Sequence, residues 1–158
     1  MASPEERVGE VLRKRKLTIS AAESCTGGRI GDKITNVPGS SDYFRGSAVT
    51  YSNESKVALL GVDRATLDRF GAVSEQVAKE MALGCIGLFG SDVSVSTTGI
   101  AGPSGGSAEK PVGLVWFALT DGDRITTEKA VFPGDRESIK EAAALFALEM
   151  IITFFASN

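Results

Sequence analysis

The side chains most able to do nucleophilic chemistry lie in a short run, ESCTGG, at residues 23–28. Ser24 and Cys25 are the two candidate nucleophiles of this run. The protein contains no histidine, which excludes every Ser-His-Asp and Cys-His mechanism. A nucleophilic serine therefore needs a lysine, a carboxylate or an activated tyrosine as its base, and a desolvated lysine is the usual substitute.

Lys56 is the best candidate for that base. It follows Tyr51 and Asn53 in a segment that should leave a second strand at the same sheet edge as residues 23–28. The commoner role of a lysine is a solvated surface residue, so the functional case depends on the missing histidine. A lysine of ordinary pKa, about 10.4, is protonated at neutral pH, so burial or a neighbouring cation must lower that pKa.

The same run allows a second chemistry, in which Cys25 is the nucleophile. Glu23 and a lysine would then be its partners, as in amidases that use Cys-Glu-Lys chemistry. Adjacent residues at a turn point in different directions, so we expect only one of Ser24 and Cys25 to face a pocket. A tight turn with capping hydroxyls and no catalytic role is the structural alternative for the whole run.

A second glycine-rich run, TGIAGPSGG at residues 98–106, follows another predicted strand. If that strand is parallel to the first, both glycine runs leave the same edge of the sheet and could hold a phosphate or an amide. The run at residues 23–28 is neither a Walker loop nor GxGxxG, because no Gly-Lys-Ser/Thr follows and its glycine spacing differs. Ser107 and Lys110 match S-x-x-K, but Pro111 follows directly, unlike the helical serine-lysine pair of penicillin-recognising enzymes.

The composition excludes several classes of protein. The 158 residues include 17 Lys+Arg and 20 Asp+Glu, a formal charge of −3, which argues against a nucleic-acid binder. No run of 18 apolar residues is present, so we expect no membrane span. Cys25 and Cys85 alone cannot build a thiolate zinc site, and we expect no metal and no cofactor. Without a disulfide framework or an apolar leader, we expect a cytoplasmic protein.

Hydrophobic and capping patterns predict alternating helices and strands. Predicted helices run from Ser3 to about Lys16, through Ile30, Ile34 and Val37, from Asn53 to Gly61, from Asp63 to Gly71, from Ser74 through Val77, Met81, Cys85 and Leu88, and onward from Asp135. Predicted strands are 17–22, 47–52, 92–98, 112–120 and 124–132, the last two joined by a hairpin at Asp121-Gly122. This order predicts one α/β domain over residues 1–158, with a mixed, mostly parallel sheet covered on both faces.

Several motifs together resemble the carboxy-terminal domain of the CinA (competence-damage-inducible) family. They are Ala22–Gly28, Val49–Lys56, Gly71–Glu75, Gly99–Pro103 with Gly105-Gly106, Lys110–Gly113 and Phe132–Arg136, in the family's order. The resemblance covers nearly the whole chain without the larger amino-terminal domain, which indicates a stand-alone form. It implies a three-layer α/β/α fold like the anticodon-binding domains, with five strands, one of them antiparallel. It also implies an amidohydrolase that converts nicotinamide mononucleotide to nicotinate mononucleotide and ammonia in pyridine-nucleotide recycling.

The resemblance also implies roles for individual residues. Ser24 would be the nucleophile, Lys56 the general base and Tyr51 an aid to proton movement, with an acyl-enzyme as intermediate. The glycine runs and nearby polar side chains are the expected substrate contacts: Thr26, Gly27, Gly28, Arg45, Asn53, Gly99, Ala101, Gly102, Gly105, Gly106, Arg136 and Lys140. Many relatives have arginine where this chain has Lys140, and lysine keeps the charge but loses the bidentate fork. The phosphate ligand stays open among Arg29, Arg45, Arg136 and Lys140.

Two other functions stay open at this point. The same glycine runs would serve a nucleotide-binding module without turnover, because family membership does not guarantee activity. An amidase for another small amide is the weaker alternative. The expected partner is a small nucleotide rather than a nucleic acid or a membrane. A homo-oligomer is compatible with the apolar tail at residues 151–155, which could form an interface as readily as part of the core.

Overall fold

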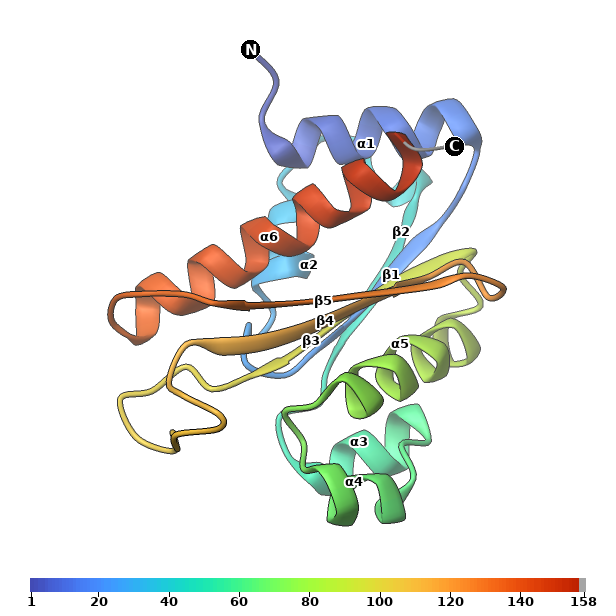
Figure 1. The fold of residues 1–158 in the computed structure, drawn as a ribbon. Coiled ribbons are helices and arrows are strands. Elements are labelled where there is room, and N and C mark those ends of the chain that lie inside the picture. Colours follow the sequence, from blue (N-terminus) through green and yellow to red (C-terminus); the bar gives the residue numbers. More distant parts are fainter. Residues whose placement is uncertain (157–158) are drawn as a thin grey trace.

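The computed structural model describes residues 1–156, built around a five-stranded sheet (Figure 1). The strands are β1 (Ile19–Glu23), β2 (Phe44–Val49), β3 (Val93–Gly99), β4 (Leu114–Thr120) and β5 (Ile125–Val131). The helices are α1 (Pro4–Arg15), α2 (Arg29–Thr35), α3 (Asn53–Leu60), α4 (Arg64–Phe70), α5 (Glu75–Phe89) and α6 (Arg136–Ala156), with a short 3₁₀ helix at Ser40–Asp42.

The strand order is β2-β1-β3-β4-β5. β1 pairs in parallel with β2 and β3, whereas β4 is antiparallel to both β3 and β5. β4 is thus the one strand that runs against the other four, which confirms the mixed, mostly parallel sheet. The predicted hairpin joins β4 to β5, and the Asp121 carboxylate accepts the Arg124 N–H at 2.8 Å within its turn. Because β1, β2 and β3 are parallel, their carboxyl ends meet at one edge of the sheet.

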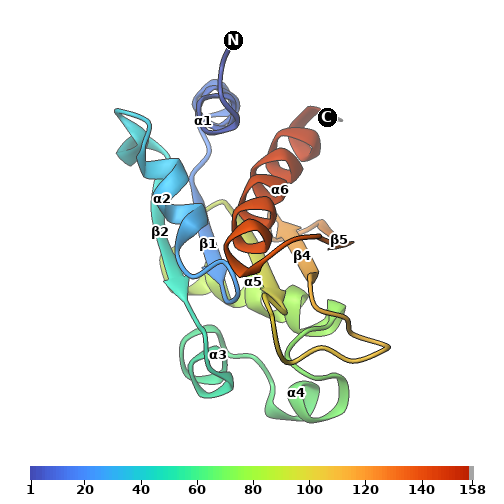
Figure 2. The same cartoon turned by 90° about the vertical axis from the view of Figure 1, so that its left-hand side faces the viewer.

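Helices cover both faces of the sheet in three layers (Figure 1 and Figure 2). On one face α6 contacts β3 and β4, α2 contacts β1 and β2, and α1 packs on α2 and α6. On the other face α5 contacts all five strands, and α3 and α4 pack mainly against α5. Since α3 follows directly after β2, its first turn reaches the edge where the parallel strands end.

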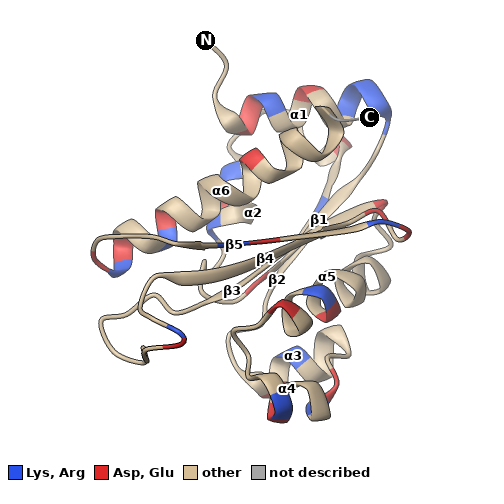
Figure 3. Ribbon diagram, in the orientation of Figure 1, with Lys and Arg blue, Asp and Glu red and all other residues tan. Residues whose placement is uncertain are grey.

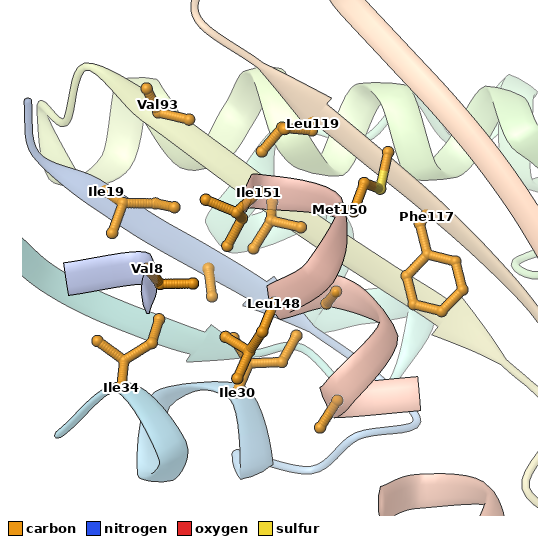
Figure 4. Close-up of a cluster of buried hydrophobic side chains, with 14 of the residues drawn as sticks. Val8, Ile19, Ile30, Ile34, Val93, Phe117, Leu119, Leu148, Met150 and Ile151 are labelled. Carbon is orange, nitrogen blue, oxygen red and sulfur yellow. The ribbon is translucent and has the colours of Figure 1, made fainter. Parts of the chain in front are cut away.

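The main hydrophobic core lies between the sheet and the layer of α1, α2 and α6 (Figure 4). Val8 of α1, Ile30 of α2 and Ile151 of α6 are fully buried there, and Phe154 and Phe155 close its far end. The apolar tail at residues 151–155 therefore contributes to the core, which settles one of the two roles left open for it.

Alternation along β1 decides where its last residues point. Ile19 and Ala21 join the core under α6, whereas Ala22 joins a second cluster against α5. Successive strand residues face opposite sides of a sheet. The same alternation at the end of the strand directs Glu23 toward α2 and Ser24 toward α3, as their hydrogen bonds show.

The helix ends follow the predicted caps. Ser3 and Glu6 form a capping box at α1, and Ser74 caps α5. The basic run at residues 13–16, blue at the end of α1 in Figure 3, closes that helix with Lys16 in the left-handed region at φ 57°. Cations at this position interact favourably with the negative end of the helix dipole. The run therefore has a structural role at the helix terminus.

Charges of both signs lie on helices of both layers (Figure 3). Among residues 1–156, no helix combines the length and the apolar character needed to cross a bilayer. In the same range, no group of three or more His, Cys, Asp or Glu residues is placed to hold a metal ion.

The predicted second strand is displaced from the observed one. β2 spans Phe44–Val49 rather than residues 47–52, and α3 is capped by Ser52 rather than by Asn53. The Ser52 hydroxyl accepts a backbone N–H one turn along, at 3.1 Å, so the chain has already left the sheet there. Thr50 and Tyr51, a β-branched and an aromatic residue, resemble strand in the sequence, but they belong to the connection that brings α3 to the sheet edge.

Two side chains expected on core faces lie elsewhere. α2 ends at Thr35, before Val37, because a Pro-Gly pair follows and stops the helix. Leu88 is 44% exposed, because the last turn of α5 packs through Phe89 instead. Phe89 lies so close to β2 that a Cβ on Gly46 of that strand would be 2.6 Å from its ring.

Candidate active site

A pocket of about 360 Å³ lies at the sheet edge where β1, β2 and β3 end. Its walls come from the turn after β1, the start of α3, the loop between α4 and α5, the loop after β3, and the first residue of α6. The lining residues are Ser24, Cys25, Tyr51, Asn53, Lys56, Ala72, Val73, Thr98, Gly99, Ile100, Ala101, Gly102, Ser104, Gly105 and Arg136. The three residue clusters that the sequence predicted to converge do meet at this edge.

Ser24 and Lys56 meet inside the pocket. Ser24 directly follows β1, Lys56 lies in the first turn of α3, and Lys56 Nζ is 2.9 Å from Ser24 Oγ. Ser24 is 7% exposed and Lys56 is 1% exposed, so both are withdrawn from bulk water. A serine hydroxyl within hydrogen-bond reach of an amine is the geometry that activation of the nucleophile requires.

The Lys56 amine is both desolvated and oriented. Nζ also lies 2.7 Å from the carbonyl oxygen of Thr50 and 3.5 Å from that of Tyr51. Burial lowers the pKa of Lys56 from 10.5 to about 8, because desolvation disfavours the charged form. A neutral amine has two hydrogens and one lone pair, so the two carbonyls can accept the hydrogens while the lone pair faces Ser24. This arrangement suits a general base that works near neutral pH.

Cys25 also contributes to the lining of the pocket, but its side chain packs in a different direction from that of Ser24. Its thiol belongs to the core under α6, and burial raises its pKa to about 12. A thiol that retains its proton is a poor nucleophile. Glu23, its expected partner, accepts three backbone N–H groups at the start of α2 instead. The geometry therefore favours Ser24 as the nucleophile.

Arg136 joins two walls of the pocket at its mouth. Its Nη1 donates to the Gly102 carbonyl at 2.6 Å, and its Nη2 donates to the Tyr51 hydroxyl at 3.0 Å. Tyr51 is 64% exposed, so this edge is open to solvent. None of the described residues that line the pocket is acidic. The pocket thus has the charge expected for an anionic ligand.

The loop after β3 turns its backbone toward the pocket. The N–H groups of Ala101, Gly102, Ser104 and Gly105 donate to no atom within residues 1–156, so they are free to bind oxygen atoms of a ligand. Gly102 has a φ of +75°, and a Cβ there would lie 2.4 Å from Val112 Cγ1. Glycine is required for this close approach.

The structure does not bring every predicted contact residue into the pocket. Those outside its lining are Thr26, Gly27, Gly28, Arg45, Gly106 and Lys140. Thr26 is fully buried and bonds Glu23 and Thr97 through its hydroxyl. The Gly28 N–H also bonds the Glu23 carboxylate. The turn after β1 therefore contributes Ser24 and Cys25 to the pocket, while its remaining polar groups are used internally.

The four basic candidates for the phosphate ligand lie in different places relative to the pocket. Arg45 is the second residue of β2 and lies toward the opposite edge of the sheet. Arg29 is ion-paired with Glu137 and Glu141 of α6. Lys140 Nζ lies against Gly27, behind the turn. Arg136 alone among these four lines the pocket.

One wall of the pocket was missed by sequence reasoning. Ala72 and Val73 come from the loop between α4 and α5, and the Thr98 hydroxyl donates to the Ala72 carbonyl at 2.8 Å. Their motif, GAVSE, carried the family resemblance without an assigned role. Lys110 of the S-x-x-K pattern donates to the Phe70 carbonyl at 2.6 Å, so it fixes the end of α4 behind this wall instead of pairing with a serine.

Comparison with known proteins gives one consistent family. Residues 1–155 match the model of the CinA C-terminal domain. The chain is 51% identical over 152 residues to the nicotinamide-nucleotide amidohydrolase PncC of Enterobacter agglomerans, covering 96% of this chain and 93% of that protein. It is 56% identical over 141 residues to a CinA-like protein of Chlorobaculum tepidum, covering 86% of this chain and 33% of that longer protein.

Solved structures agree with this match. A CinA superfamily protein from Klebsiella pneumoniae superimposes with a TM-score of 0.94 at 33% identity, covering 99% of this chain and all of that one. The competence/damage-inducible protein from Agrobacterium tumefaciens gives 0.90 at 40% identity, covering 97% and 96% of the two chains. The sheet order, the pocket at the edge of the parallel strands and these matches together place the chain in the CinA C-terminal domain family.

Proposed function

We propose that the protein is an amidohydrolase that deamidates nicotinamide mononucleotide to nicotinate mononucleotide and ammonia. The 2.9 Å contact between Ser24 and a desolvated Lys56 is the observation that carries this proposal. Similarity to a nicotinamide-nucleotide amidohydrolase, along nearly the full length of both chains, supports the choice of substrate.

The proposed reaction proceeds through an acyl-enzyme. Neutral Lys56 accepts the Ser24 proton as Ser24 Oγ attacks the carboxamide carbon, and the carbonyl π electrons move to oxygen. When the tetrahedral intermediate collapses, the C–N bond breaks, Lys56 returns the proton to nitrogen, and ammonia leaves. Water then attacks the ester with Lys56 again as base, releasing the carboxylate and regenerating Ser24.

Backbone N–H groups would stabilise the developing oxyanion. Those of Ala101, Gly102, Ser104 and Gly105, in the loop after β3, have no acceptor among the described residues. Donors fixed before the reaction begins are worth more than mobile ones, because they need no reorganisation in the transition state.

Arg136 would bind the phosphate of the nucleotide. It is the basic side chain at the pocket mouth, and its guanidinium already faces polar atoms of two walls. Tyr51 contacts Arg136 through its hydroxyl, which supports a role in substrate binding better than the expected role in proton movement. Asn53 lines the same wall and would contact the ribose or the amide.

Ammonia release tests this function. The substrates are nicotinamide mononucleotide, nicotinamide riboside and nicotinamide, which differ by the phosphate and the ribose. We expect kcat/KM to fall in that order. A preference for the free base would overturn the nucleotide assignment and favour an amidase for another small amide. Calorimetric binding of the nucleotide without ammonia release would instead favour a binding module.

A further inference from the structure

Glu23 is a buried carboxylate that the reaction above does not use. It is fully buried, and within residues 1–156 no other Asp or Glu side chain is buried. Its two oxygens accept five hydrogen bonds. The donors are Thr26 Oγ1, the backbone N–H groups of Gly28, Ile30 and Gly31, and Ser47 Oγ, at 2.5–3.1 Å.

These donors surround the turn that carries the nucleophile. Thr26 lies in the middle of that turn and Gly28 at its end, while the Gly27 N–H returns to the Ser24 carbonyl at 3.1 Å. The Glu23 side chain therefore fixes the path of the chain that follows Ser24.

The main chain of Glu23 fixes the base as well. Its carbonyl accepts the Thr50 N–H at 2.7 Å and the Thr50 hydroxyl at 3.3 Å. The Thr50 carbonyl in turn accepts Lys56 Nζ at 2.7 Å, and Nζ lies 2.9 Å from Ser24 Oγ. Glu23, Thr50, Lys56 and Ser24 thus form a closed ring of contacts.

We propose that Glu23 is a positioning residue for the reaction: its carboxylate holds the nucleophile turn so that Ser24 meets Lys56 in the attacking geometry. The effect of Glu23 on turnover of the nucleotide depends on the proposed function, but the positioning of Ser24 does not. A helix cap with a purely structural role would affect stability alone. A positioning residue also affects the reactivity of Ser24, because displacement of the reacting atoms by about 1 Å can cost about 100-fold in rate.

The test is Glu23→Gln, with Asp63→Asn as its matched control. Gln keeps the size of the side chain but places an NH₂ donor against groups that are themselves donors. Asp63 caps α4, accepts the Ala65 N–H at 2.9 Å, and lies outside the pocket lining. We expect Glu23→Gln to lower kcat about 100-fold with KM changed less than about threefold. Asp63→Asn should lower the melting temperature without changing kcat.

A second measurement does not depend on the substrate. The rate at which an aryl sulfonyl fluoride modifies Ser24, followed by intact mass, should fall at least about tenfold in Glu23→Gln and stay unchanged in Asp63→Asn. If the parent protein is modified at Ser24 but releases no ammonia from the nucleotide, the proposed function fails while this measurement still tests the positioning role.

Ser47→Ala extends the test if Glu23→Gln does not fold. It removes one of the five donors and should slow the modification of Ser24 by about threefold to tenfold, a loss of about 1 kcal/mol. The proposal is overturned if the folded Glu23→Gln protein, or Ser47→Ala in its place, is modified at the parent rate. It is also overturned if Asp63→Asn slows the modification equally.

Discussion

The two glycine-rich runs look alike in the sequence but are used in different ways. Both follow parallel strands and leave the same edge of the sheet. In the turn after β1 the glycine N–H groups bond within the protein, to Glu23 and to Ser24. In the loop after β3 the N–H groups of Ala101, Gly102, Ser104 and Gly105 bond nothing within residues 1–156. The first run thus holds the nucleophile, and the second is open to a ligand.

The difference has a simple physical cause. Unpaired N–H groups at a strand-to-helix turn attract an anion, and a carboxylate that begins the turn can be that anion. Glu23 supplies it in the first run. The second run has no acidic residue from 98 to 106, so its N–H groups stay available. A glycine run after a strand is therefore a candidate ligand site only when the chain does not provide its own acceptor.

The largest expected effect is on the turn after β1. Ser24→Ala and Lys56→Met should each lower kcat by at least about 10³-fold, because nucleophile and base act as one unit. Lys56→Met removes a desolvated amine, so its melting temperature should not fall. Ammonia release and thermal unfolding measure both effects.

Cys25→Ala is the control for this pair and should retain most of the activity, since its thiol lies in the core under α6. A fully active Ser24→Ala protein, or an inactive Cys25→Ala protein that is folded, would move the nucleophile from Ser24 to Cys25. In that case the turn after β1 would not serve to hold Ser24 as the nucleophile.

Arg136 tests whether the open side of the pocket binds the substrate. Arg136→Met should raise KM for nicotinamide mononucleotide by about 10- to 100-fold, the range for a lost charge-assisted hydrogen bond, with a smaller effect on kcat. KM for nicotinamide riboside, which lacks the phosphate, should barely change. Arg45→Met at the opposite edge of the sheet is the control, and an equal rise in KM there would contradict the assignment.

The pH dependence follows from the Lys56 amine. Because the neutral amine is the base and burial lowers its pKa to about 8, kcat/KM should rise about tenfold from pH 7 to pH 9 and then level off. The folded state binds this proton less tightly than the unfolded state. The free energy of unfolding should therefore increase as pH rises from about 8 to 10.5. A rate that falls over the same range would rule out a neutral lysine base.

Much of the fold and part of the site could be predicted from the sequence. The caps at Ser3, Asp63 and Ser74 mark helix starts, and the hairpin turn at Asp121 places the reversed strand. Local signals of this kind act over a few residues, so the sequence displays them directly. They were sufficient to bring the clusters around Ser24 and Lys56 to one edge of the sheet.

The remainder of the site depends on contacts that local signals do not reveal. The wall at Ala72 and Val73 exists because α5 crosses the whole sheet and carries the preceding loop to the pocket. The role of Glu23 depends on the direction of its side chain, which alternation along β1 assigns only when the strand boundary is known to one residue. A shift of one residue would direct it to the other face.

The smallest expected effect compares one glycine from each run. Gly27 has a φ of +60° and Gly105 a φ of +93°, and a Cβ at Gly105 would meet only Ile100 Cγ2, at 3.7 Å. Alanine at either position should cost about 1–2 kcal/mol of stability from backbone strain. Beyond this shared loss of stability, the two variants should differ in which kinetic parameter, kcat or KM, they change.

Gly27→Ala disturbs the turn that holds Ser24, so it should lower kcat severalfold and leave KM unchanged. Gly105→Ala adds a methyl group to the pocket wall, so it should raise KM severalfold and leave kcat unchanged. Steady-state kinetics on the two variants, compared at equal fractions folded, measure this separation. If both variants change the same parameter, the two runs act on the substrate together, and the division between a holding turn and a binding loop does not stand.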